Sequence, residues 1–338
     1  MQERNYIGSA HLSTSGCPIK DTTMSGRIAL IGSQGYLGSH VSAALGHAGC
    51  RVVGINRRWH GAPHDQPAIA ADMTQPALTE AALFGIDTVI NCAAGPPLTH
   101  TAIAMNLRNW RDAAPGRALV HVSTLAVFAG HGGVVTEATA PQAHRLRGYA
   151  MAKLQTERLL TARDAMGDTL IIRPGCIYGP GSKPWVDRIA RLIRAGRLGD
   201  LGKLGAGVCP LIHVRDLADI IAEAAMRPLP GLRIQHAVTA EPPSWNAYFR
   251  VLGGLIGVEQ PPRINAMTLA AEAWLRHPAA RILRRTGTDT ISPSMRSLFR
   301  DQTVYAAPAS IPSTPLLNGL AEAAAAFLAA VPTSPAPA

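Results

Sequence analysis

A glycine-rich turn between an apolar run and a helical pattern is the feature that most restricts the fold of this 338-residue chain. Residues 27–31 (RIALI) favour a strand, and Gly32, Gly35 and Gly38 follow at three-residue spacing before apolar residues recur with a helical period. In such a turn the first glycine permits the tight bend, the second lets backbone approach a pyrophosphate, and the third lets helix pack on strand. We therefore predict a phosphate cradle for a dinucleotide, with a simple glycine turn as the alternative.

The residues after the next strand indicate which dinucleotide is bound. Residues 51–55 favour a second strand, and Asn56, Arg57 and Arg58 follow where an NAD site usually places an acidic residue. Because a guanidinium can hold a phosphate with two hydrogen bonds, these arginines favour NADP. NAD with two ordinary surface arginines is the alternative.

Strand-like and helix-like segments alternate along the first half of the chain. Residues 68–71, 88–92, 119–122 and 170–174 are strand-like, and helical patterns separate most of them. This alternation predicts a doubly wound parallel sheet of the α/β class, whose ligands bind outside the carboxyl ends of the strands. Asp72 follows one strand and could hydrogen-bond an adenine amine, and small residues from Cys92 onward could let a flat cofactor lie against backbone.

Tyr149 and Lys153 stand four residues apart in a segment with a helical pattern. On a helix this spacing places both side chains on one face. A free tyrosine titrates near pH 10, and a neighbouring cation lowers that pKa toward the working range of a general acid or base. The pair predicts proton-transfer chemistry, although the same spacing also occurs on solvated helix faces.

The chain divides into a regular part and a less regular part. We expect residues 1–25 to be a flexible leader and residues 26–180 to be a Rossmann dinucleotide-binding domain with the catalytic residues. Residues 181–331 should form mainly a smaller, mostly helical substrate-binding part, with late elements returning to the Rossmann core. The Pro- and Ala-rich residues 332–338 should be a disordered tail.

Composition disfavours several classes of protein, a nucleic-acid binder among them. The net charge is +10, but the arginines are scattered and accompany no nucleic-acid-reading module. The five cysteines lack metal-ligand spacing, and so do His121, His131 and His144, so we expect no metal, no disulfide and a cytoplasmic location. No apolar run reaches the roughly 18 residues that would span a membrane.

Five motifs in order resemble the extended short-chain dehydrogenase/reductase superfamily, which contains epimerases, dehydratases and 3β-hydroxysteroid- or dihydroflavonol-type reductases. They are the glycine turn at 32–38, VSTLAVF at 122–128, the Tyr149–Lys153 pair, RPGCIYGPG at 173–181 and IHVRDLA at 212–218. The resemblance implies that Tyr149 exchanges a proton with the substrate oxygen as hydride passes to or from nicotinamide. Lys153 would lower the pKa of Tyr149 and bind the nicotinamide ribose, and Thr124 would hydrogen-bond the substrate oxygen.

The predicted cofactor contacts follow the strand ends and the catalytic helix. They are Gly32, Gln34, Gly35, Tyr36, Leu37, Gly38, Asn56, Arg57, Arg58, Asp72, Met73, Cys92, Ala93, Ala94, Asn106, Val122, Ser123, Tyr149, Lys153, Pro174, Gly175 and Ile177.

Two departures from the family pattern bear on the substrate. Cys176 stands where nucleotide-sugar members usually carry an asparagine, and the apolar residues 207–211 replace a segment that usually carries an arginine. Without these partners a buried diphosphate would be poorly held. We therefore expect an NADP-dependent oxidoreductase that acts on a ketone or secondary alcohol of a small, non-nucleotide molecule.

Two other functions remain open: a nucleotide-sugar epimerase or dehydratase with tightly bound NAD, and a non-catalytic NADP-sensing protein on the same fold. Relatives in this superfamily often form dimers, so a homodimer is also open.

Overall fold

The computed structural model describes residues 27–58, 67–162, 167–276, 279, 289–306 and 314–330 of the chain. The predicted leader (1–25) and tail (332–338) lie outside these residues.

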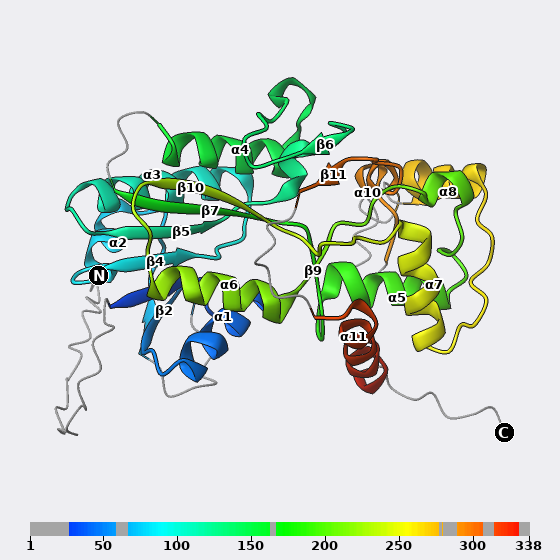
Figure 1. Ribbon diagram of the computed structural model, residues 1–338, viewed down its shortest axis with the longest axis horizontal. Helices are drawn as coiled ribbons and strands as arrows, with labels where there is room; N and C mark the ends of the chain where they lie inside the picture. The colour runs from blue at the N-terminus through cyan, green and yellow to red at the C-terminus, as the bar shows by residue number, and fades with distance from the viewer. Residues whose placement is uncertain are drawn as a thin grey trace, which may run out of the picture.

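A seven-stranded parallel sheet forms the centre of the described structure and confirms the predicted doubly wound α/β fold (Figure 1). The strand order is β10-β7-β5-β4-β1-β2-β3. The chain adds strands in one direction from β1 and then resumes on its other side at β4. In folds of this kind, ligands bind outside the carboxyl ends of the strands at such a reversal. The strands are β1 (Ile28–Ile31), β2 (Val52–Asn56), β3 (Ala68–Ala70), β4 (Thr88–Asn91), β5 (Ala118–Val122), β7 (Asp168–Pro174) and β10 (Leu232–Ala237).

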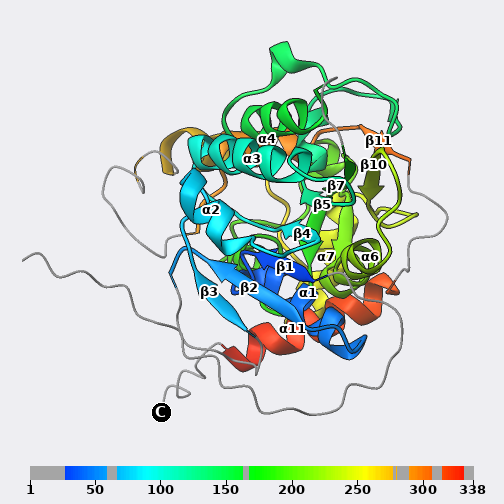
Figure 2. The ribbon, with the colours of Figure 1, turned by 90° about the vertical axis from the view of Figure 1, so that its left-hand side faces the viewer.

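Helices cover both faces of the sheet, as Figure 2 shows. Because successive side chains of a strand point to opposite faces, β1 supplies Ile28 and Leu30 to one apolar cluster and Ala29 and Ile31 to another. The first cluster includes α1 and α6, and the second includes α2, α3 and α4. These helices are α1 (Tyr36–His47), α2 (Pro76–Ala82), α3 (Pro97–Asp112), α4 (Gly148–Leu160) and α6 (Val214–Met226).

A second, mostly helical body follows the sheet and has its own core (Figure 1). Trp245, Tyr248, Phe249 and Phe299 are fully buried there in an aromatic cluster. Its elements are β8 (Cys176–Tyr178), α5 (Arg188–Arg194), β9 (Leu211–His213), α7 (Trp245–Leu255), α8 (Ala266–Ala271), α10 (Pro293–Leu298) and α11 (Leu316–Ala330). In the sequence, α6 and β10 come between β9 and α7. In space, β10 belongs to the sheet and α6 to the helices that cover it.

Among the described residues, two short strand pairs form outside the seven-stranded sheet. Val134–Val135 (β6) pairs with Val304–Tyr305 (β11), and β8 pairs with β9. Gly130 and Gly132 donate backbone hydrogen bonds to the side chains of Asp301 and Thr303, at 2.8 and 2.9 Å. The segment around β11 therefore binds the loop that follows β5.

Residues 183–198 do not form one continuous α-helix. A π-helical turn spans Lys183–Asp187, and α5 ends at Arg194. Pro184 lacks the amide that a regular first turn would share, and Gly196 adopts a φ of +64°, which ends the helix.

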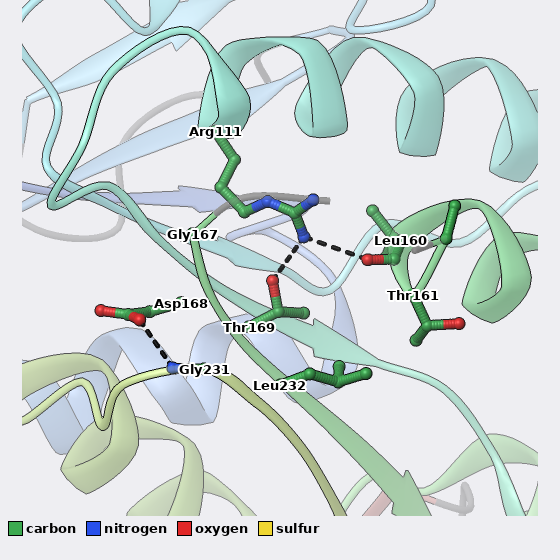
Figure 3. A pocket seen from close by; sticks show the side chains of 9 residues that line it. Arg111, Leu160, Thr161, Gly167, Asp168, Thr169, Gly231 and Leu232 are labelled. Carbon is green, nitrogen blue, oxygen red and sulfur yellow. Dashed lines mark hydrogen bonds between the residues drawn. The ribbon is translucent and has the colours of Figure 1, made fainter. Parts of the chain in front are cut away.

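A shallow pocket at the amino edge of β7 and β10 lies at the opposite edge of the sheet from the predicted site (Figure 3). The Arg111 guanidinium extends beside it and donates a 3.1 Å hydrogen bond to the carbonyl of Leu160 at the end of α4. Arg111 thus satisfies a helix C-terminus, which is a structural role. Within the described residues, no helix is long and apolar enough to cross a membrane, and no cluster of metal-binding side chains occurs.

Candidate active site

The register of the parallel strands brings most of the predicted site to one edge of the sheet. Ile31 pairs with Ile55 on one side and with Asn91 on the other, and Asn91 pairs with His121. The residues that follow these strands are therefore level with one another. They include the glycine turn, Asn56 to Arg58, Cys92 to Ala94, and Val122 to Thr124.

The glycine turn is packed too closely for side chains. Gly32 has a φ of +80°, and a Cβ there would lie 3.1 Å from the backbone of Cys92. A Cβ on Gly38 would lie 2.0 Å from the Gly32 carbonyl oxygen. Gly35 precedes the first turn of α1, which no described side chain caps. The amides in the first turn of a helix have no partner within the helix, so together with the positive end of the helix dipole they suit a phosphate.

Asn56 braces this turn from the end of β2. Its Nδ2 donates to Ser33 Oγ at 2.7 Å, and its Oδ1 accepts from the Gln34 amide at 3.2 Å. Its side chain therefore shapes the cradle from within the protein. Arg57 and Arg58 are exposed directly after it.

Asp72 and Met73 follow β3, and hydrogen bonds fix both residues at the end of that strand. The side chain and amide of Thr74 donate to Asp72 Oδ1 at 2.7 and 3.0 Å, and these bonds hold the pKa of Asp72 below its usual value. Met73 is buried, and its carbonyl accepts a 3.0 Å hydrogen bond from Asn106 Nδ2. In this structure Met73 and Asn106 contact each other, which fixes α3 against the β3 edge.

The small residues after β4 are held by Asn91. Its Oδ1 accepts from the Ala93 amide at 3.1 Å, and its Nδ2 lies 3.1 Å from His121 Nδ1. His121 is buried in β5, so its ring contacts Asn91 inside the protein. Burial raises the pKa of the Cys92 thiol to about 12, so this thiol stays protonated.

Thr124, Tyr149 and Lys153 lie close together at the carboxyl end of β5. Thr124 caps a short 3₁₀ turn, accepting from the Ala126 amide at 3.1 Å, and its side chain also hydrogen-bonds Tyr149. Lys153 Nζ donates to the Val122 carbonyl at 2.8 Å and lies 6.0 Å from the centre of the Tyr149 ring. Tyr149 is 52% exposed, whereas Lys153 is buried. Tyr149 is therefore the most exposed side chain of the three, and Thr124 is half-buried.

The pKa of Tyr149 differs from the sequence prediction. Burial of the phenol raises its pKa above 10, which outweighs the lowering effect of the Thr124 hydrogen bond. Burial lowers the pKa of Lys153 to about 8, so the lysine carries less charge than expected. The predicted lowering of the Tyr149 pKa by Lys153 is not present in this structure.

A buried ion pair lies behind Tyr149 and Lys153. Glu157 is one turn beyond Lys153 on α4 and accepts from Arg173 Nη2 at 2.7 Å and from Arg173 Nε at 3.0 Å. The Ser123 hydroxyl donates to the same carboxylate. Ser123, predicted as a cofactor contact, therefore uses its hydroxyl inside the protein. The sequence signal for Glu157 was a carboxylate on the apolar face of a helix.

The loop after β7 lies against the second body. A Cβ on Gly175 would lie 1.9 Å from the Pro210 carbonyl oxygen, so only glycine fits there. Pro174 is the last residue of β7, and Ile177 accepts a 2.8 Å hydrogen bond from Ser182 Oγ. Cys176 is 5% exposed and belongs to the apolar core of the second body.

Two other predicted contacts, Tyr36 and Leu37, open α1. The Tyr36 hydroxyl lies 3.2 Å from the position of a Cβ on Gly179, so this ring joins the glycine turn to the loop after β8. Leu37 packs against the apolar cluster beneath α1 and α6.

Comparison with known proteins agrees with this geometry. The profile of the NAD dependent epimerase/dehydratase family matches residues 28–233. A dTDP-4-dehydrorhamnose reductase of Mycobacterium tuberculosis is 28% identical over 230 residues, covering 62% of this chain and 69% of that protein. A ceramide reductase of Caulobacter vibrioides is 26% identical over 247 residues, covering 72% of this chain and 74% of that protein.

Solved structures show the same fold. The structure described as MoeE5 in complex with UDP-glucuronic acid and NAD has a TM-score of 0.68 and 21% sequence identity, covering 90% of this chain and 100% of that one. At this identity the likeness concerns the fold alone.

Proposed function

Because the chain belongs to the NAD dependent epimerase/dehydratase family, we propose that it is an NADP-dependent oxidoreductase acting on a ketone or secondary alcohol of a small, non-nucleotide substrate. The observation that carries this proposal is the meeting of Thr124, Tyr149 and Lys153 beside the glycine turn. Both curated relatives are named as reductases, which supports an NAD(P)-dependent enzyme.

The residues suggest a division of labour in ketone reduction. Bound nicotinamide would supply the hydride. With its raised pKa, Tyr149 is protonated at neutral pH, which is the state that a general acid needs. Thr124, already hydrogen-bonded to the phenol, would orient the carbonyl oxygen. Lys153 would stabilise the tyrosinate that forms, because its ammonium is held near the ring.

Two observations support NADP over NAD. Asn56, at the end of β2, is occupied with the glycine turn, and the exposed Arg57 and Arg58 follow it. Neither guanidinium is needed to brace the turn, so both could hold a 2′-phosphate.

The substrate class is argued from Cys176. Its thiol is buried among apolar and aromatic side chains, and the segment leading to β9 is equally apolar, with Cys209 and Leu211 fully buried. A nucleotide diphosphate held at these positions would lack polar partners, which is costly for a desolvated anion. A small carbonyl compound has no such requirement.

A nucleotide-sugar enzyme with bound NAD is the second candidate. It is favoured by the relative named for a dTDP-sugar. The apolar surroundings of Cys176 count against it.

One experiment separates the two candidates. The purified protein is denatured and the supernatant analysed for dinucleotide, and the native protein is then tested against a panel of ketones with NADPH and NADH. We expect no stoichiometric NAD and faster oxidation of NADPH than of NADH. Release of one NAD per chain, with no turnover of any ketone, would support the nucleotide-sugar candidate.

A further inference from the structure

Tyr149 is poorly fixed by its own helix. Helix α4 begins at Gly148, which has a φ of +53°, and the preceding Arg147 makes no side-chain capping bond. The tyrosine is the second residue of that uncapped first turn and is half exposed. Because the first turn of a helix without a cap frays readily, contacts from elsewhere must hold the phenol in place.

His100 supplies such a contact from α3. The His100 and Tyr149 rings meet edge to face, with their centroids 6.1 Å apart and their planes at 70°. His100 is 5% exposed, and α3 is anchored in the core through Ile103 and Leu107. Edge-to-face contacts between rings are directional, so this contact restricts where the phenol can lie.

His100 also contacts the loop on which a cofactor would lie. A hydrogen bond joins its ring to the backbone of Gly95, in the turn after β4. Its other nitrogen, Nε2, is buried and has no hydrogen-bond partner among the described residues. Burying a polar atom without a hydrogen-bond partner costs free energy of folding. An apolar side chain would avoid this cost if the position served packing alone.

The surroundings keep His100 uncharged. Burial and the nearby Lys153 ammonium lower its pKa to about 4. A protonated His100 would place a second positive charge near the Lys153 ammonium, and the two charges would repel each other. The other neighbours of that lysine, His121 and Cys92, are neutral. The ring is therefore a neutral contact surface for the phenol at ordinary pH.

We propose that His100 is a positioning residue, which joins the loop after β4 to Tyr149 and holds the phenol beside Thr124. Any effect on turnover rests on the proposed function, whereas the contact itself does not. The experiment below reports on the contact directly, so the two can fail separately.

The test is ¹⁹F NMR of the whole chain labelled with 3-fluorotyrosine. The chain contains six tyrosines, and the Tyr149 signal is assigned by its disappearance in Tyr149→Phe. His100→Leu fills similar space without a ring, and His100→Phe keeps the ring. His131→Ala is the matched control, because His131 makes the same kind of ring contact, at 6.0 Å, with Phe128.

We expect the Tyr149 signal to move toward the position of free fluorotyrosine and to sharpen in His100→Leu. It should stay near the wild-type position in His100→Phe and in His131→Ala. A Tyr149 signal that His100→Leu leaves unchanged would overturn the proposal, as would a shift in His100→Phe as large as that in His100→Leu.

Turnover provides a second readout. With a ketone found in the panel, His100→Leu should lower kcat about tenfold with little change in the KM for NADPH, and His100→Phe should restore most of it. Equal kcat values in all three proteins would contradict a positioning role. If no ketone is turned over but the NMR result is as expected, the proposed function fails and the positioning of Tyr149 stands.

Discussion

Replacing Glu157 by Gln should destabilise the fold strongly while changing its shape very little. The Glu157 and Arg173 side chains are each 4% exposed and share two hydrogen bonds. The substitution removes the negative charge and leaves the buried guanidinium, one of whose nitrogens already lacks a partner among the described residues. Breaking a buried pair in this way costs about 3–5 kcal/mol.

The assay is thermal unfolding followed by calorimetry or circular dichroism. At roughly 2 °C for each kcal/mol in a chain of this size, Tm should fall by about 6–10 °C. Glu322→Gln is the matched control, because Glu322 pairs with Arg215 on the surface, where the side chains are 46% and 55% exposed. That change should cost less than about 1 kcal/mol.

A double variant separates charge from packing. Replacing Glu157 and Arg173 together by methionine removes both buried charges, so it should be less destabilising than Glu157→Gln alone. The reasoning is refuted if Glu157→Gln and Glu322→Gln shift Tm equally, or if the double variant is the least stable protein.

Three further predictions concern the cofactor site and pH. Gly38→Ala should abolish NADPH binding measured by fluorescence titration, because the new methyl group would lie 2.0 Å from the Gly32 carbonyl oxygen. An unchanged affinity for NADPH would contradict the close packing of the turn. The double variant Arg57→Ala with Arg58→Ala should raise the Kd for NADPH tenfold or more, because a hydrogen bond to a charged group contributes about 1.5–3 kcal/mol. The Kd for NADH should stay unchanged. Equal effects on the two Kd values would argue against a 2′-phosphate site. The His100 pKa of about 4 lies below its unfolded value, so the unfolded chain binds more protons between pH 6.5 and 4 and stability falls as pH drops. In His100→Phe the fall in Tm over this window should be smaller, and parallel curves would contradict the assigned pKa.

Local patterns were sufficient to predict the framework of the site. Strand, glycine turn and helix are consecutive in the chain, so the cradle from Gly32 to Gly38 was visible without tertiary information. The same holds for Tyr149 and Lys153, which one helix places on one face. Strand alternation then predicted that these segments share an edge, because all ligands of a parallel sheet meet at its carboxyl ends.

Contacts between distant segments could not be predicted in this way. Pairing of β6 with β11 joins residues 134–135 to 304–305, and each strand is too short to have a periodic signal. His100 and Tyr149 are brought together only by the packing of α3 on α4. The pKa of Tyr149 depends on its burial, which spacing along a helix does not report.

The most direct test of the central claim is single-turnover oxidation of NADPH by wild type and Tyr149→Phe, with a ketone found in the panel. Loss of one hydroxyl should slow the absorbance change at about 340 nm by roughly 10²–10⁴-fold, the usual contribution of a general acid, while the Kd for NADPH stays within about twofold. Hydride transfer in Tyr149→Phe at a rate within about tenfold of wild type would contradict the assignment of Tyr149 as the proton donor.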